Sequence, residues 1–86
     1  MKPHTKIYLT AMSYDVSDFI FCEVCEAQAV DIHHIESRGM GGTKREDTID
    51  NLMAMCRKCH SELGDIKELK EKLLYIHQLR MRERGI

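Results

Sequence analysis

The pattern of hydrophobic and polar positions predicts two short strands followed by helices. Residues 29–35 are rich in β-branched side chains and residues 51–55 form a short apolar run, so we predict that these segments pair as strands. The stretch 36–50 between them is charged and contains several glycines, which is typical of a loop. Residues 56–63 predict a short helix that ends at Gly64, a favourable residue for a helix C-cap.

The longest helical pattern runs over residues 65–84, with Asp65 as its N-cap candidate. Its apolar residues recur at helical spacing and predict one stripe that covers a small core: Ile66, Leu69, Leu73 and Ile76. Gly85 is expected to end this helix. Three arginines near its end suit the helix dipole and are a candidate contact for DNA: Arg80, Arg82 and Arg84. Residues 1–20 predict a loosely packed lead-in with one helical turn or a short strand.

The length and net charge of the chain limit the classes of function that it can have. A chain of 86 residues makes one small domain over residues 1–86, and such a chain usually needs a cross-link or a metal to stabilise its limited core. The net charge of −1 excludes a protein that coats DNA generally, so any DNA contact must be local. There is no apolar run of membrane-spanning length and no stretch typical of a signal peptide, so we expect a cytoplasmic protein that contacts no membrane. In a reducing cytosol, the stabilising element is expected to be a metal.

The cysteines form two Cys-x-x-Cys pairs, Cys22 with Cys25 and Cys56 with Cys59. Each pair presents two thiolates from one turn, and two such pairs complete the tetrahedral four-sulfur site that structural Zn²⁺ prefers. A redox pair and four unrelated core thiols are the alternatives. Redox chemistry needs one pair, however, and core thiols seldom occur at this spacing. The sequence therefore predicts a structural zinc site.

Histidines accompany these cysteines. His33 and His34 lie in the first predicted strand, and His60 directly follows the second cysteine pair. Neutral imidazole is both a common metal ligand and a proton acceptor near pH 7. A lone histidine is more often structural, but three histidines beside a zinc site and a glycine-rich loop indicate a chemical role.

Together these motifs resemble the HNH endonucleases over about residues 20–63. The resemblance is carried by six motifs in order: Cys22-x-x-Cys25, Asp31-Ile32-His33-His34-Ile35, Ser37-Arg38-Gly39, Gly41-Gly42, Asn51-Leu52 and Cys56-x-x-Cys59-His60. It implies an α+β chain with the ββα-metal fold, stapled by zinc over residues 21–63 and extended by the helix 65–84. The order strand, loop, strand, helix derived above agrees with that fold.

The resemblance also implies a role for each site residue. His34 is the general base that takes a proton from the attacking water, and Asn51 holds the glycine-rich loop so that this base is oriented. His60 and His33 are ligands of a catalytic divalent metal. Arg38 is a candidate contact for a phosphate oxygen, because a guanidinium suits phosphate geometry, and a solvated loop arginine is the alternative.

Two features do not fit these roles neatly. Neighbouring residues on an ideal strand face opposite sides, so His33 and His34 can share a site only near a strand end or a bulge. Gly64 stands where many family members carry a further histidine, so the metal has two histidine ligands at most, completed by Asn51 or water. We therefore expect weak affinity for a catalytic Mg²⁺, Mn²⁺, Ni²⁺ or Zn²⁺ ion.

The function that the resemblance implies is a metal-dependent DNA endonuclease that hydrolyses phosphodiester bonds. The alternative is a non-catalytic, zinc-stabilised module that binds nucleic acid or protein, which the net negative charge and Gly64 favour. A small structural zinc protein is a third interpretation. Free-standing HNH domains of this size resemble those of phages, which implies a host-cell cytoplasm. The oligomeric state stays open between a monomer, a homodimer and a larger phage complex.

Overall fold

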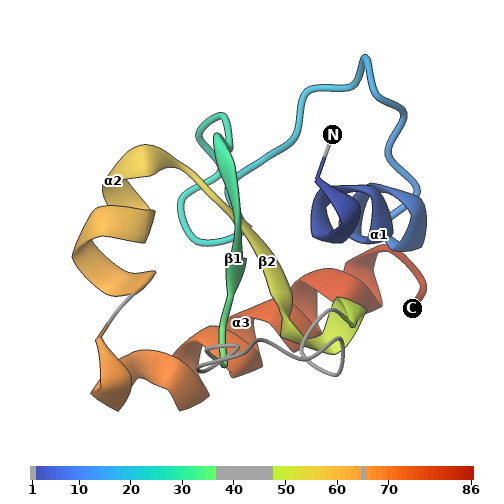
Figure 1. Cartoon of the computed structure of the whole chain (residues 1–86). Coiled ribbons are helices and arrows are strands. Elements are labelled where there is room, and N and C mark those ends of the chain that lie inside the picture. Colours follow the sequence, from blue (N-terminus) through green and yellow to red (C-terminus); the bar gives the residue numbers. More distant parts are fainter. Residues whose placement is uncertain (1, 37–47, 65) are drawn as a thin grey trace.

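The computed structural model describes residues 2–36, 48–64 and 66–86. Two strands lie at the centre, with α1 and α2 on opposite sides of them and α3 running beneath in the view of Figure 1. In chain order the elements are α1 (Pro3–Ala11), β1 (Asp31–His34), η2 (Ile49–Asn51), β2 (Leu52–Met55), α2 (Arg57–Cys59), η3 (His60–Gly64), η4 (Lys67–Leu69) and α3 (Lys70–Glu83). Of these, η2 and η4 are 3₁₀ turns and η3 is a π-helical turn. The order β1–β2–α2, followed by α3, confirms the predicted α+β class.

The two strands form an antiparallel pair in which His34 lies opposite Leu52. A further backbone hydrogen bond, from the Val30 N–H to the Met55 carbonyl, extends the pairing beyond the start of β1. Both predicted strands are confirmed, although each is shorter than the segment expected from the sequence. Because β1 ends at His34, the two adjacent histidines lie at the end of the strand.

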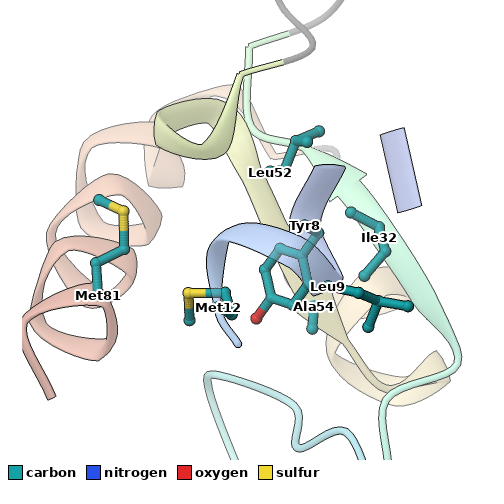
Figure 2. Packing of buried hydrophobic residues seen from close by; sticks show 7 residues of the cluster. All are labelled: Tyr8, Leu9, Met12, Ile32, Leu52, Ala54 and Met81. Carbon is teal, nitrogen blue, oxygen red and sulfur yellow. The ribbon is translucent and has the colours of Figure 1, made fainter. Parts of the chain in front are cut away.

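The strand β2 separates two hydrophobic cores, because side chains alternate between the faces of a strand. Leu52 and Ala54 belong to the core beside α1, whereas Met53 and Met55 belong to the core around the cysteines. Figure 2 shows the first core, which consists of Tyr8, Leu9, Met12, Ile32, Leu52, Ala54 and Met81. The second core consists of Cys22, Ile35, Met53, Met55, Cys56, Cys59 and Leu73. Every residue of β2 is buried, so this short strand is the centre of the packing.

The N-terminal segment is more ordered than the sequence predicted. Its helix α1 has 9 residues and begins at a proline, whose fixed φ suits the first position of a helix. Tyr8, Leu9 and Met12 are buried in the first core. The helix ends at Ala11, with Met12 as its C-cap. Ser13 follows with a φ of 63°, and the Tyr14 N–H donates to the Leu9 carbonyl. A single buried turn is too short a pattern to identify from sequence, and for this reason the expectation of a loose lead-in was wrong.

The C-terminal helix begins later than predicted. It starts at Lys70 after the turn η4, while Asp65, the N-cap candidate, lies outside the described residues. Ile66 is 41% exposed and takes no part in the core. The buried face of α3 consists of Leu73, His77 and Met81. Gly85, with a φ of 81°, ends the helix as predicted. At 14 residues α3 is too short to span a bilayer, and no described helix has the length and apolar character to do so.

Candidate metal centre and histidine cluster

The four cysteines meet at one point. The turn that precedes β1 carries Cys22 and Cys25, and the start of α2 carries Cys56 and Cys59. All four Sγ atoms lie within 4.8 Å of one another, and the Sγ atoms of Cys25 and Cys56 are 3.6 Å apart. Tetrahedral zinc with Zn–S bonds of about 2.3 Å separates its sulfurs by about 3.8 Å. The cluster therefore fits a structural metal such as zinc.

The surroundings of the thiols also favour a bound cation. The Cys59 N–H donates to Cys56 Sγ and lowers the pKa of Cys56 to about 7, whereas burial raises the pKa of Cys59. Thiolates this close to one another repel, so all four cannot ionise unless a cation neutralises them. A metal at this point would tie the turn before β1 to the start of α2, which are far apart in the sequence.

Two of the predicted site histidines, His33 and His60, lie side by side. Their ring centroids are 4.8 Å apart, and His33 is only 8% exposed. Gly64 packs against both rings: a β-carbon there would lie 2.6 Å from His60 Cδ2 and 3.3 Å from His33 Cε1. The predicted C-cap role of Gly64 is wrong, because Gly64 is the last residue of η3 and lacks the positive φ of a C-cap glycine. The missing β-carbon of this glycine therefore lets the rings of His60 and His33 pack directly against its backbone.

Asp31, the first residue of β1, lies behind His60. Its Oδ2 atom is 3.4 Å from His60 Nδ1. A carboxylate against one ring nitrogen holds an imidazole in orientation and directs the other nitrogen toward a metal. Asp31 is part of a motif that carried the resemblance, but the sequence assigned it no role. Its contact with His60 arises only when β1 packs against η3.

His34 faces the opposite side of β1 from His33, toward α1. Its ring centroid is 4.7 Å from that of His4, with the two rings tilted by 59°. Because the strand ends here, His33 and His34 nevertheless line one pocket of about 230 Å³, together with Gly64 and Lys67. The sequence pattern allowed His33 and His34 to share a site only near a strand end or a bulge, and these two residues do lie at the end of β1. No motif in the sequence points to His4, which lies outside the family motifs.

Asn51, the last residue of η2, is buried and contacts the chain directly after β1. Its Oδ1 accepts a hydrogen bond of 2.7 Å from the Glu36 N–H, and its Nδ2 donates one of 3.1 Å to the Glu36 carbonyl. The amide thus holds both backbone groups of one residue just before residues 37–47, which lie outside the described part of the chain. Arg38, the predicted phosphate contact, falls in that undescribed range.

A buried polar network that the sequence pattern did not predict lies behind the cysteine turn. The carboxylate of Glu23, which is 3% exposed, accepts a hydrogen bond from the Tyr8 hydroxyl and lies 2.7 Å from His77 Nδ1. The other ring nitrogen of His77 contacts the Ile49 carbonyl. Both partners of this ring are acceptors, so the doubly protonated imidazolium satisfies both of them. Burial lowers the pKa of His77, but the hydrogen bond and charge of Glu23 outweigh this effect, so the pKa lies above its usual value.

This network joins α1, the cysteine turn, η2 and α3. One signal for it exists in the sequence, because His77 lies four residues after Leu73 and four before Met81, on the same helix face. A polar residue at a core position of a helix needs a buried partner. The identity of that partner, Glu23, depends on the fold.

The arginines at the end of α3 contact the protein itself. Arg80 Nε donates to the Glu23 carbonyl at 2.9 Å, and its guanidinium lies 3.6 Å from the carboxylate of Glu26. The guanidinium of Arg84 lies over the Tyr14 ring, 3.9 Å from its centroid. Packing thus accounts for two of the three arginines that the sequence offered as DNA contacts.

The cysteine cluster and the β1–β2–α2 order define the ββα-metal fold with a four-cysteine structural site. The family model for HNH endonuclease matches residues 22–65, which is about half of the chain. The chain therefore belongs to the HNH endonuclease family, as its motifs predicted. The match runs from the first cysteine through the second pair and His60, and α1 and α3 lie outside it. Comparison with curated proteins and with solved structures gave no significant match.

Proposed function

We propose that the protein is a metal-dependent DNA endonuclease that hydrolyses phosphodiester bonds. Membership of the HNH family indicates a nuclease-like role on nucleic acid. The observation that carries the finer proposal is the pair of His33 and His60 over Gly64, with His34 in the same pocket. A purely structural four-cysteine site makes no use of these two imidazoles.

The histidines are proposed to divide the chemistry. His33 and His60 hold one divalent metal, which would supply positive charge to the scissile phosphate and to the leaving oxygen. His34 accepts a proton from the attacking water, whose oxygen bonds to phosphorus as the bond to the 3′-oxygen breaks. Since His34 faces α1 while His33 faces η3, the base stays outside the ligand set.

Three further residues are proposed to support this chemistry. Asn51 fixes the backbone just beyond the base, because its amide holds the Glu36 N–H and carbonyl. Asp31 orients His60 through Nδ1. Arg38 is proposed to contact a phosphate oxygen through paired hydrogen bonds.

The identity of the catalytic metal is proposed from its ligands. Two imidazoles make a small ligand set, and Gly64 has no side chain that could add a third ligand. Imidazole nitrogen favours the later divalent ions, so Ni²⁺, Mn²⁺ and Zn²⁺ should bind more tightly than Mg²⁺. Cleavage should therefore need less Mn²⁺ or Ni²⁺ than Mg²⁺.

Incubation of the zinc-loaded protein with supercoiled plasmid tests the proposal directly. We expect relaxed or linear plasmid when Mn²⁺, Ni²⁺ or Mg²⁺ is added, and none when no divalent ion is added. The matched control is His34→Ala, which should retain its zinc and its melting temperature but cleave much more slowly. A wild-type protein that leaves plasmid intact with every ion would rule out the endonuclease.

A non-catalytic nucleic-acid-binding module is the second candidate function. Gly64 in the place of a further histidine and the net charge of −1 favour it. Such a module would retard DNA in a gel shift at low salt and release it steeply as salt rises, without cutting plasmid under any metal.

A further inference from the structure

We propose that Lys67 and Lys70 form a binding site for a DNA phosphate beside the histidines, and that Glu36 holds this place in the DNA-free protein. The inference rests on the proposed nucleic-acid substrate and names where its backbone lies. Neither lysine belongs to the motifs that define the family, and Lys67 and Lys70 lie beyond the segment that the family model matches.

The pocket at the end of β1 has two walls of different character. Its lining residues are His33, His34, Ile35, Gly64, Ile66, Lys67 and Lys70. The strand end supplies the imidazoles, and the segment from η4 to the start of α3 supplies the lysines. Apart from its histidines, the ionisable residues in this lining are Lys67 and Lys70, and both carry a positive charge. The protein as a whole carries a net charge of −1. A phosphate in this pocket meets imidazole on one side and ammonium on the other.

The spacing of the lysines explains why they act together. Residues three apart on a helical turn lie on the same side, and Lys67 and Lys70 accordingly both line this pocket. Lys70 is also the first residue of α3, where the positive end of the helix dipole adds to its charge. Lys72, two residues further along, is exposed and does not line the pocket.

The carboxylate of Glu36 occupies the position beside Lys70 that we assign to the phosphate. Its Oε2 atom lies 3.0 Å from Lys70 Nζ, and its backbone is held at both polar groups by Asn51. The carboxylate therefore stays near Lys70 even though the pair is open to solvent, with the side chains of Lys70 and Glu36 33% and 56% exposed. An exposed pair of this kind contributes little stability, so a phosphate can replace the carboxylate at low cost.

This arrangement predicts effects of opposite sign from two partners of one ion pair. Removing the charge of Lys70 or Lys67 removes a phosphate contact and weakens DNA binding. Removing the charge of Glu36 frees Lys70 and takes away a repulsive carboxylate, so DNA binding becomes tighter. A purely structural ion pair predicts no change in DNA binding for either substitution.

Fluorescence anisotropy with a short labelled duplex, measured without added divalent ions so that cleavage plays no part, tests the proposal. Lys67→Gln and Lys70→Gln should each weaken binding by roughly three- to tenfold and lower the salt slope by about 0.9 per lost contact. Glu36→Gln should tighten binding by roughly two- to fivefold. Lys72→Gln, an exposed lysine of the same helix, is the control and should match the wild type in zinc content, melting temperature and affinity.

The proposal is overturned if Lys67→Gln and Lys70→Gln bind the duplex like Lys72→Gln, or if Glu36→Gln binds no more tightly than the wild type. The plasmid assay runs in parallel and separates the two proposals. Lysine-dependent DNA binding without any cleavage would refute the endonuclease and retain the phosphate site. Cleavage with lysine-independent binding would do the reverse.

Discussion

At Gly64, the lack of a β-carbon allows two imidazoles to stand side by side. The sequence showed only that this position lacks the histidine of many relatives. The structure adds that any side chain here would meet the rings of His60 and His33, at 2.6 Å and 3.3 Å from its β-carbon. The glycine is therefore a condition of the two-histidine arrangement.

Gly64→Ala tests this interpretation with one methyl group. The new β-carbon must push the ring of His60 aside, so we expect Mn²⁺ affinity and cleavage to fall at least about tenfold, because a small misplacement of a reacting group carries a large cost. Isothermal titration with Mn²⁺ measures the affinity, and zinc content should stay at about one ion per chain. Ser61→Ala, an exposed position in the same turn, is the control. Unchanged Mn²⁺ affinity in Gly64→Ala would refute the steric argument.

His4 provides a second test at this scale. Its ring packs against the ring of His34 and limits the rotamers of the proposed base. Because tilted ring pairs contribute about 1 kcal/mol, His4→Ala should lower kcat roughly fivefold with little change in KM. His4→Phe keeps the ring and should retain most of the activity, whereas Thr10→Ala on the exposed side of α1 should behave as wild type. A kcat for His4→Phe as low as that for His4→Ala would show that packing is not the role of His4.

The sequence predicted the residues whose partners lie at fixed spacing. The paired cysteines are three apart, and the adjacent His33 and His34 belong to one motif. Roles for these residues could therefore be proposed from the sequence without knowledge of the fold. His4 and Asp31 were not predicted as members of the site, because each meets its partner only after separate elements have packed. Long-range contacts of this kind leave no periodicity in a sequence.

Among the elements, the two strands could be predicted because each is short, apolar and bounded by turn residues. The helix α1 could not, since its buried face is a single turn built from Tyr8, Leu9 and Met12. The helix α3 was predicted, but its start was placed too early because Ile66 fits the apolar period and yet stays exposed. The tertiary environment, rather than periodicity, decided these boundaries.

The buried network between α1 and α3 gives the structure a measurable pH dependence. The pKa of His77 lies above its usual value in the folded protein, so its proton stabilises the fold below the unfolded pKa of about 6.5. That stability is lost as pH rises through the raised pKa. We expect the melting temperature of the wild type to exceed that of His77→Gln by more at pH 6 than at pH 9, both being zinc-loaded. A gap that widens as pH rises would contradict the charged state of His77.

At the scale of the whole molecule, one short strand stands between two small cores. Helices α1 and α3 contribute Tyr8 and Met81 to the core on one side, and Leu73 of α3 joins the cysteines on the other. This shared packing supports the proposal that residues 1–86 form one domain. A core of this size is limited, so we expect a metal at the cysteine site to supply much of the stability.

Loss of one cysteine should therefore unfold the protein. Structural zinc sites bind with about 10–16 kcal/mol, which rivals or exceeds the stability of a small domain. We expect Cys56→Ser to lose its zinc and to show no cooperative melting transition by circular dichroism. Native zinc content and an unchanged melting temperature in this variant would refute the structural role of the cluster.

The most direct test of the central claim is plasmid cleavage as a function of Mn²⁺ concentration for the wild type, His34→Ala and His60→Ala. Loss of a base lowers the maximal rate, by roughly 10²–10⁴-fold, and leaves the Mn²⁺ concentration at half-maximal rate unchanged. Loss of a ligand shifts that concentration upward, and excess Mn²⁺ partly restores the rate. The account predicts the first result for His34→Ala and the second for His60→Ala, with zinc retained in both. Cleavage by both variants at the wild-type rate and Mn²⁺ dependence would contradict it.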